Sequence, residues 1–137
     1  MRCDGQSIPL PQGGYDRIYL LAASADKDRT AEFTVGGKTF DRFVPYYSGF
    51  YGQWGHDGKE GYVKDADIAR VFTHRHSNEF GNEAYVFTYM YKICLPLDNG
   101  AAELILPKDK NIMLFAATLA GGRNESLTPV NEVRALP

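Results

Sequence analysis

The sequence predicts an all-β domain, a jelly-roll-like antiparallel β-sandwich of about seven to nine strands with one long loop rich in glycine and aromatic residues. Three observations predict this fold. Short apolar runs alternate with turn signals along the chain, no segment has an extended helical period, and the chain contains 9 Tyr and 8 Phe. Flat rings suit the pleated, half-buried surface of a sheet. The length of 137 residues is typical of one domain, which we expect to span residues 1–137.

The first half of the chain predicts three strands and the long loop. Arg17 to Ala25 is apolar on both alternating faces, which is typical of a central strand covered on each side. Thr30 to Val35 and Lys38 to Val44 flank Gly36-Gly37. This pattern predicts a hairpin, because two glycines supply the positive φ of a tight turn. Residues 46–65 contain five glycines, four tyrosines and the only tryptophan, and they predict an ordered loop with short strand pieces.

The second half predicts further strands. Asp65 to Arg70 fits one helical turn with Asp65 as its cap. Tyr85 to Leu97 is the strongest strand, because every second residue from Tyr85 to Leu95 is aromatic or aliphatic and therefore shares one face. Ala102 to Leu106 and Ile112 to Leu119 predict two more strands. The polar residues 120–137 predict a connecting tail.

Charge and hydropathy argue against two classes of partner. The formal net charge is −2 with no run of like charges, so we expect no nucleic-acid partner. No stretch approaches the roughly 18 apolar residues that span a bilayer, so we expect no membrane partner. Cys3 and Cys94 are able to pair or to stay free, and the bulky apolar neighbours of Cys94 predict a buried thiol rather than a nucleophile.

His74 and His76 form the most suggestive polar cluster. On a strand they point to the same side about 7 Å apart, a spacing that a metal ion uses, and Glu79 or Glu83 would supply a third ligand. The alternative is that these side chains bond the following loop or line a polar surface that contacts sugar. A His-x-His pair without a fixed third partner is a weak metal motif. Arg75 points oppositely and is expected to pair with a carboxylate.

Trp54 is the second candidate for ligand contact. It lies in a glycine-rich segment beside Tyr51 and Gln53, where a ring offers its face to a sugar and the amide bonds hydroxyl groups. The alternative is that Trp54 closes one end of the sandwich, and its indole N–H needs a partner in either arrangement. The candidate ligand-binding residues are therefore Tyr51, Gln53, Trp54, His74, Arg75, His76 and Glu83.

No catalytic constellation stands out from the sequence. Ser77 lies beside His76 only locally, and the spacing of the carboxylates shows no acid–base pair. We therefore expect no catalytic residue and no cofactor in this chain.

Several motifs, in order, resemble a known family. Gly5 to Ile8 followed by Ile18 to Ala23 resembles the opening of sugar-binding, galactose-binding-like β-sandwich modules. The later segments are similar to the C-terminal region of bacterial α-mannosidase-like proteins of glycoside hydrolase family 38. These segments are Gly49 to Trp54, Thr73 to His76, Tyr85 to Tyr89, Leu95 to Leu97, Leu104 to Pro107 and Ile112 to Leu119.

The resemblance, which covers residues 5–120, implies a parent enzyme with a zinc-dependent catalytic domain and an aspartate nucleophile that precede the β-rich domains. No segment here matches that zinc site or nucleophile. The expectation is an accessory domain whose partner is its own catalytic domain, with zinc only in the parent, which would act on mannose-containing glycans in the periplasm or outside the cell. The alternatives are a free-standing carbohydrate-binding module and a small cupin-like metal enzyme built on His74 and His76. An accessory domain is expected to expose an apolar patch where its neighbour packs.

Overall fold

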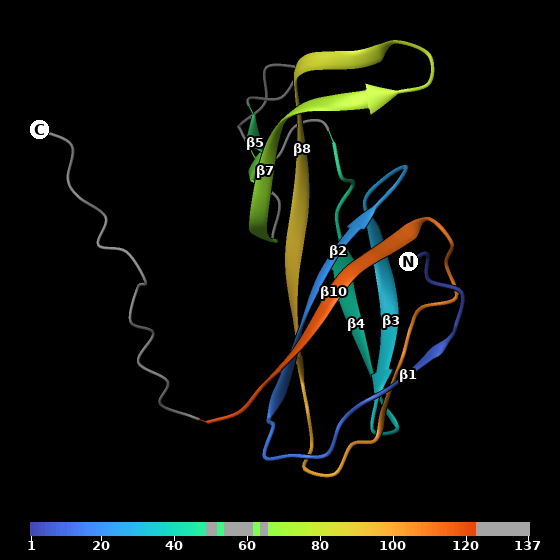
Figure 1. Ribbon diagram of the computed structural model, residues 1–137, viewed down its shortest axis with the longest axis vertical. Helices are drawn as coiled ribbons and strands as arrows, with labels where there is room; N and C mark the ends of the chain where they lie inside the picture. Colours follow the sequence, from blue (N-terminus) through green and yellow to red (C-terminus); the bar gives the residue numbers. More distant parts are fainter. Residues whose placement is uncertain (49–51, 54–61, 64–65, 123–137) are drawn as a thin grey trace, which may run out of the picture.

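The computed structural model describes residues 1–48 and 66–122, together with the backbone of 52–53 and 62–63. Within these residues the chain forms two four-stranded sheets, ordered β1-β9-β3-β4 and β10-β2-β8-β7, and β5 pairs with β6 separately (Figure 1). The strands are β1 Ser7–Pro9, β2 Arg17–Ser24, β3 Arg29–Val35, β4 Lys38–Val44, β5 Gly52–Gln53, β6 Tyr62–Val63, β7 Asp67–Ser77, β8 Gly81–Pro96, β9 Glu103–Ile105 and β10 Ile112–Ala120. The predicted all-β sandwich is confirmed.

The hydrophobic core lies between the two sheets, because alternate residues of each strand face the opposite sheet. β2 contributes Ile18 and Leu20, and β3 contributes Phe33, all fully buried. Burial of such side chains is the main favourable term in folding, about 1.5 to 3 kcal/mol for each. The core also includes Cys3, Leu10, Ala22, Ala31, Val35, Val44, Ile93, Leu95, Leu97, Leu104, Leu106, Ile112 and Leu114.

The predicted first hairpin is confirmed. β3 and β4 pair from Arg29–Val44 to Val35–Lys38, and Gly36 and Gly37 form the turn between them. Both glycines have positive φ, 54° and 78°, which is the two-residue turn that matches the twist of the strands. β2 is a central strand, as predicted, between β10 and β8. Its core face is fully buried, whereas Tyr19 and Leu21 on its outer face are only half-buried.

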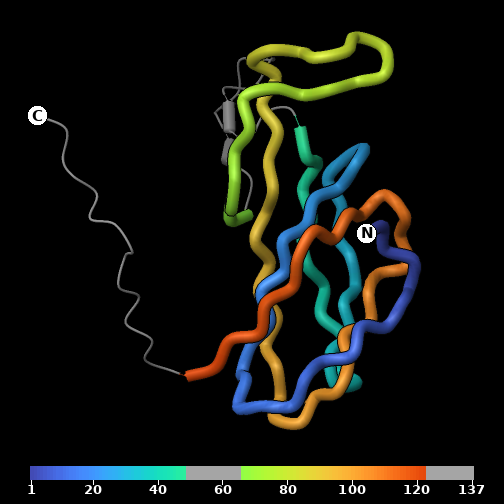
Figure 2. Tube along the Cα trace, viewed as in Figure 1, coloured from blue at the N-terminus to red at the C-terminus, as the bar shows by residue number. Residues whose placement is uncertain are grey.

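The alternating apolar residues predicted for β8 are buried in its C-terminal half and exposed at the start of its N-terminal half. Tyr91, Ile93 and Leu95 are buried, but Tyr85 is 83% exposed and Phe87 is 43% exposed. The physical reason is visible in Figures 1 and 2: β8 extends past its neighbour β2 and past the opposing strands β3 and β4, so the other sheet does not cover its first residues. The alternation of apolar residues along β8 therefore continues beyond the part of the strand that the second sheet covers.

Two local predictions are corrected by strand pairing. Asp67 to Arg70, predicted as part of a helical turn, lie in strand β7, where Asp67 pairs with Lys92 and Ile68 with Tyr91 on β8, and the predicted cap Asp65 lies outside the described residues. Hydrogen bonds from the neighbouring strand satisfy the backbone N–H and C=O groups of this segment, and this pairing outweighs a weak local preference for a helical turn. Cys94 is exposed rather than buried, because it alternates with core-facing neighbours and points to the outer face. Cys3 and Cys94 are both free thiols.

The remaining predictions concern the long loop and the tail. Short strand pieces are present within residues 46–65, at β5 and β6. The predicted tail begins at Ala120, the end of β10, and residues 123–137 lie outside the described part. Among the described residues, no helix is long and apolar enough to cross a membrane.

Candidate functional site

The β7–β8 hairpin projects past the end of the sandwich and bends sharply near its tip (Figures 1 and 2). The bend coincides with a shift in strand register: Phe72 pairs with Thr88, but the next pair is His74 with Ala84. β8 therefore inserts extra residues, the arrangement of a β-bulge, which bends a strand pair. Tyr85 lies within this insertion with φ of 62°. It is the one non-glycine residue of the described chain with positive φ.

The base of the hairpin is held by the chain that follows β4. Ser24 at the end of β2 donates its backbone N–H to the carbonyl of Pro45 at 2.8 Å. Tyr47 then donates to the Ser24 carbonyl at 2.8 Å and accepts from the backbone N–H of Tyr89 at 2.7 Å. This segment crosses from one sheet to the other, because β4 and β2 belong to different sheets. It anchors β8 where β8 leaves the sandwich.

Arg75 and Glu83 form a two-pronged ion pair across the hairpin. Arg75 Nε donates to Glu83 Oε2, and Nη2 donates to Oε1, both at 2.8 Å. The prediction that Arg75 pairs with a carboxylate is confirmed. Hydrogen bonding from the guanidinium lowers the pKa of Glu83, and the carboxylate in turn raises the pKa of Arg75. Planar pairing of this kind fixes geometry, and here it fixes the two strands beyond the bulge.

His74 and His76 share the same strand, β7, as predicted. His76 Nδ1 lies 2.8 Å from Asn82 Oδ1, so the ring donates to the amide oxygen across the hairpin. Glu83, one of the two predicted third ligands, accepts hydrogen bonds from Arg75 at both of its carboxylate oxygens. No group of three or more His, Cys, Asp or Glu side chains with the geometry of a metal site occurs among the described residues.

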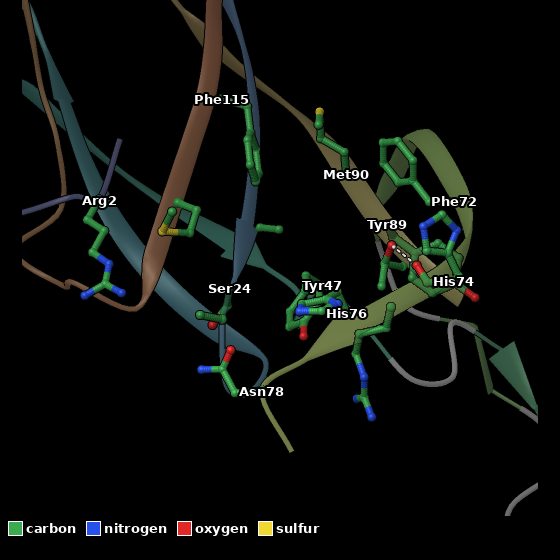
Figure 3. A pocket seen from close by; sticks show the side chains of 15 residues that line it. Arg2, Ser24, Tyr47, Phe72, His74, His76, Asn78, Tyr89, Met90 and Phe115 are labelled. Carbon is green, nitrogen blue, oxygen red and sulfur yellow. Dashed lines mark hydrogen bonds between the residues drawn. The ribbon is translucent and has the colours of Figure 1, made fainter. Parts of the chain in front are cut away.

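A groove of about 860 Å³ lies between the bent hairpin and the outer face of the β10-β2-β8-β7 sheet (Figure 3). Tyr47, from the crossing segment, carries a phenol whose pKa is raised, chiefly by burial. The residues lining the groove are Arg2, Ala23, Ser24, Ala25, Tyr47, Phe72, His74, Arg75, His76, Asn78, Thr88, Tyr89, Met90, Met113 and Phe115. The volume is typical of small-molecule sites.

Exposed apolar side chains concentrate on the hairpin. Eight large hydrophobic residues of the described chain are exposed, and five of them lie between Val71 and Phe87. Single exposed apolar residues are ordinary on protein surfaces, whereas a concentration on one projecting element indicates a contact surface. The five are Val71, Phe72, Phe80, Tyr85 and Phe87.

The structure brings together part of the candidate set from the sequence. His74, Arg75 and His76 line the groove, and Glu83 is joined to it through Arg75. Tyr51, Trp54 and the side chain of Gln53 lie outside the described residues. Sequence reasoning missed the opposite wall: Met113 and Phe115 on β10, and Arg2, which forms an isolated antiparallel bridge with Met113. Alternation along β10 could have placed Met113 on the outer face, because its neighbours Ile112 and Leu114 are buried on the core side.

Comparison with known proteins gives one family. The family model described as AziU2-like beta-sandwich domain matches residues 1–123. That range contains the described part of the chain, including both sheets and the hairpin. The search of the curated proteins gives no match.

Proposed function

We propose that this chain, which belongs to the family of AziU2-like β-sandwich domains, is a non-catalytic docking domain that packs against a protein partner through its β7–β8 hairpin. The observation that carries the proposal is the set of exposed apolar side chains on this hairpin, five of the eight in the described residues. An element that leaves the sandwich and carries aromatic side chains into solvent loses their burial energy unless a partner covers them.

The construction of the hairpin supports a role as a rigid projection. The Arg75–Glu83 ion pair and the His76–Asn82 hydrogen bond link its two strands beyond the bulge. Tyr85 occupies a backbone conformation that costs a non-glycine residue energy, and its side chain is 83% exposed. In the isolated domain, this backbone strain is not offset by packing of the exposed side chain. Strained backbone of this kind clusters at binding elements.

The partner that fits this surface is a protein with an apolar recess. Tyr85 and Phe80 would act as anchors, since aromatic side chains are enriched among the residues that dominate binding energy. We propose that the partner is an enzyme or the catalytic part of the same protein, and that the domain shapes access to it. The motif resemblance to family 38 α-mannosidases is the sole support for a glycoside hydrolase partner acting on mannose-containing glycans. A carbohydrate-binding role for Tyr51 and Trp54 stays a prediction.

Site-specific photocrosslinking tests the proposal in the native cell. A benzophenone amino acid replaces Tyr85, and in a matched control it replaces Glu32, an exposed residue of β3 in the other sheet. We expect one defined crosslinked protein, or one internal crosslink to a separate domain, at position 85 and none at position 32. Equal crosslinking at both positions, or none at position 85, would overturn the docking role. The identity of the crosslinked polypeptide tests separately whether the partner is an enzyme and of which class.

A further inference from the structure

The groove beneath the hairpin has a composition that indicates a small-molecule ligand rather than a protein. Part of its lining is apolar, formed by Met90 on β8 together with Met113 and Phe115 on β10. Phe115 is 52% exposed within it. Methionine side chains adapt to the shape of an apolar ligand, because they are unbranched and polarizable. A groove of about 860 Å³ accepts a molecule of ordinary cofactor or metabolite size.

Two arginines and no described carboxylate line the groove. The arginines are Arg2 and Arg75, and none of the described lining residues is Asp or Glu. Arg75 is already paired with Glu83. Arg2 differs, because its guanidinium makes no ion pair and no hydrogen bond with the described residues.

Neither carboxylate that is bonded to a lining residue is paired with Arg2. Ser24 donates to Asp26, but Arg29 holds both oxygens of Asp26, at 3.0 and 2.6 Å. Glu83 is likewise held by Arg75 at both oxygens. The guanidinium of Arg2 is therefore able to bind an anion in the partly apolar groove. A guanidinium donates two parallel N–H hydrogen bonds to a carboxylate, so a carboxylate is the anion that fits it.

We propose that this groove binds an amphipathic organic carboxylate, with the acid group at Arg2 and the apolar body along Met113, Phe115 and Met90. Arg2 is placed for this role by its bridge to Met113, since directly opposed residues of adjacent strands share one face. In Figure 3, Arg2 lies at one side of the view, Phe72 lies at the other, and Phe115 and Met90 lie between them. A ligand with an anionic head and a hydrophobic body matches that order. Asn78 also lines the groove and offers an amide donor.

The test compares an acid with its neutral isostere. 6-Phenylhexanoate and 6-phenylhexanamide are titrated into the ¹⁵N-labelled full chain and followed by two-dimensional NMR. We expect the acid to bind with a Kd of about 1 mM or below, with shifts around Met90 and Met113. The amide should bind at least about fivefold more weakly, because it lacks the charge that Arg2 recognises.

Variants assign the two halves of the site. Arg2→Gln should reduce the affinity for the acid to that for the amide, whereas Phe115→Ser should weaken both ligands. Lys38→Gln, at the exposed first residue of β4 in the other sheet, is the matched control and should change neither. Equal affinity for acid and amide in the wild type, a preference for the acid that survives Arg2→Gln, or no saturable binding of the acid would overturn the proposal. Binding that responds to Tyr85→Ser but not to Phe115→Ser would move the ligand from the groove to the docking surface, and would also overturn it.

Discussion

Replacing Tyr85 by glycine is expected to stabilise the isolated domain. Tyr85 has φ of 62°, in the left-handed region, where a residue with a Cβ loses about 1 to 2 kcal/mol. Glycine removes that cost but loses about 0.5 to 1 kcal/mol more conformational freedom on folding. The side chain is 83% exposed, so its removal sacrifices little buried area. The net expectation is a gain of about 0.5 to 1 kcal/mol in the free energy of unfolding.

Urea unfolding followed by circular dichroism measures this gain, with Tyr85→Ala as the control. Alanine removes the ring but keeps a Cβ at positive φ, so its effect should stay within about 0.5 kcal/mol of the wild type. Both variants should unfold with the slope of the wild type, since neither changes the surface exposed on unfolding. A glycine variant no more stable than the alanine variant would show that Tyr85 is not strained, and the argument that the domain sacrifices stability to display this ring would fail.

Three further predictions address the core, the thiols and the acid response. Phe33→Ala should lower the free energy of unfolding by about 3 to 5 kcal/mol in chemical denaturation, because Phe33 is fully buried between the sheets; a loss under about 1 kcal/mol would contradict the assigned core. A thiol reagent at pH 8 should label Cys94 quickly and Cys3 only after unfolding, since Cys94 is exposed and burial raises the pKa of Cys3 to about 11; mass spectrometry of the native protein would refute this if Cys3 were labelled first. Hydrogen bonding from Arg29 lowers the pKa of Asp26 from 3.8 to about 2, so its stabilising contribution is present above pH 3.8 and is lost as the pH falls toward 2. Asp26→Asn should therefore lose less stability than the wild type over that acid range in thermal melts, and an identical pH profile would count against the Arg29 contact.

Local chemistry made much of the sandwich predictable. Gly36-Gly37 defines the β3–β4 turn, because two consecutive residues with positive φ favour glycine at both positions. The alternating pattern also located Tyr91, Ile93 and Leu95 in the core, since the opposing sheet covers that half of β8. Each of these features is determined by residues close together in the sequence or by a simple period.

The bent hairpin and its groove depend on contacts that a single sequence does not display. The bend requires the register shift between β7 and β8, and its positive φ falls on Tyr85, a residue type that gives no signal for one. Arg2 reaches the groove because it pairs with Met113, near the other end of the chain. The segment predicted as a helical turn became part of β7 through pairing with β8. Long-range strand pairing decides all three outcomes, and tertiary context overrides local preference.

The affinity between this domain and the partner identified by crosslinking tests the central claim most directly. Isothermal titration would compare the wild type with Tyr85→Ser, on the hairpin, and Phe115→Ser, in the groove. The docking role predicts at least a tenfold rise in Kd for Tyr85→Ser, about 1.4 kcal/mol, and no change for Phe115→Ser. An unchanged Kd for Tyr85→Ser, or an equal rise for both variants, would contradict the role proposed for the β7–β8 hairpin.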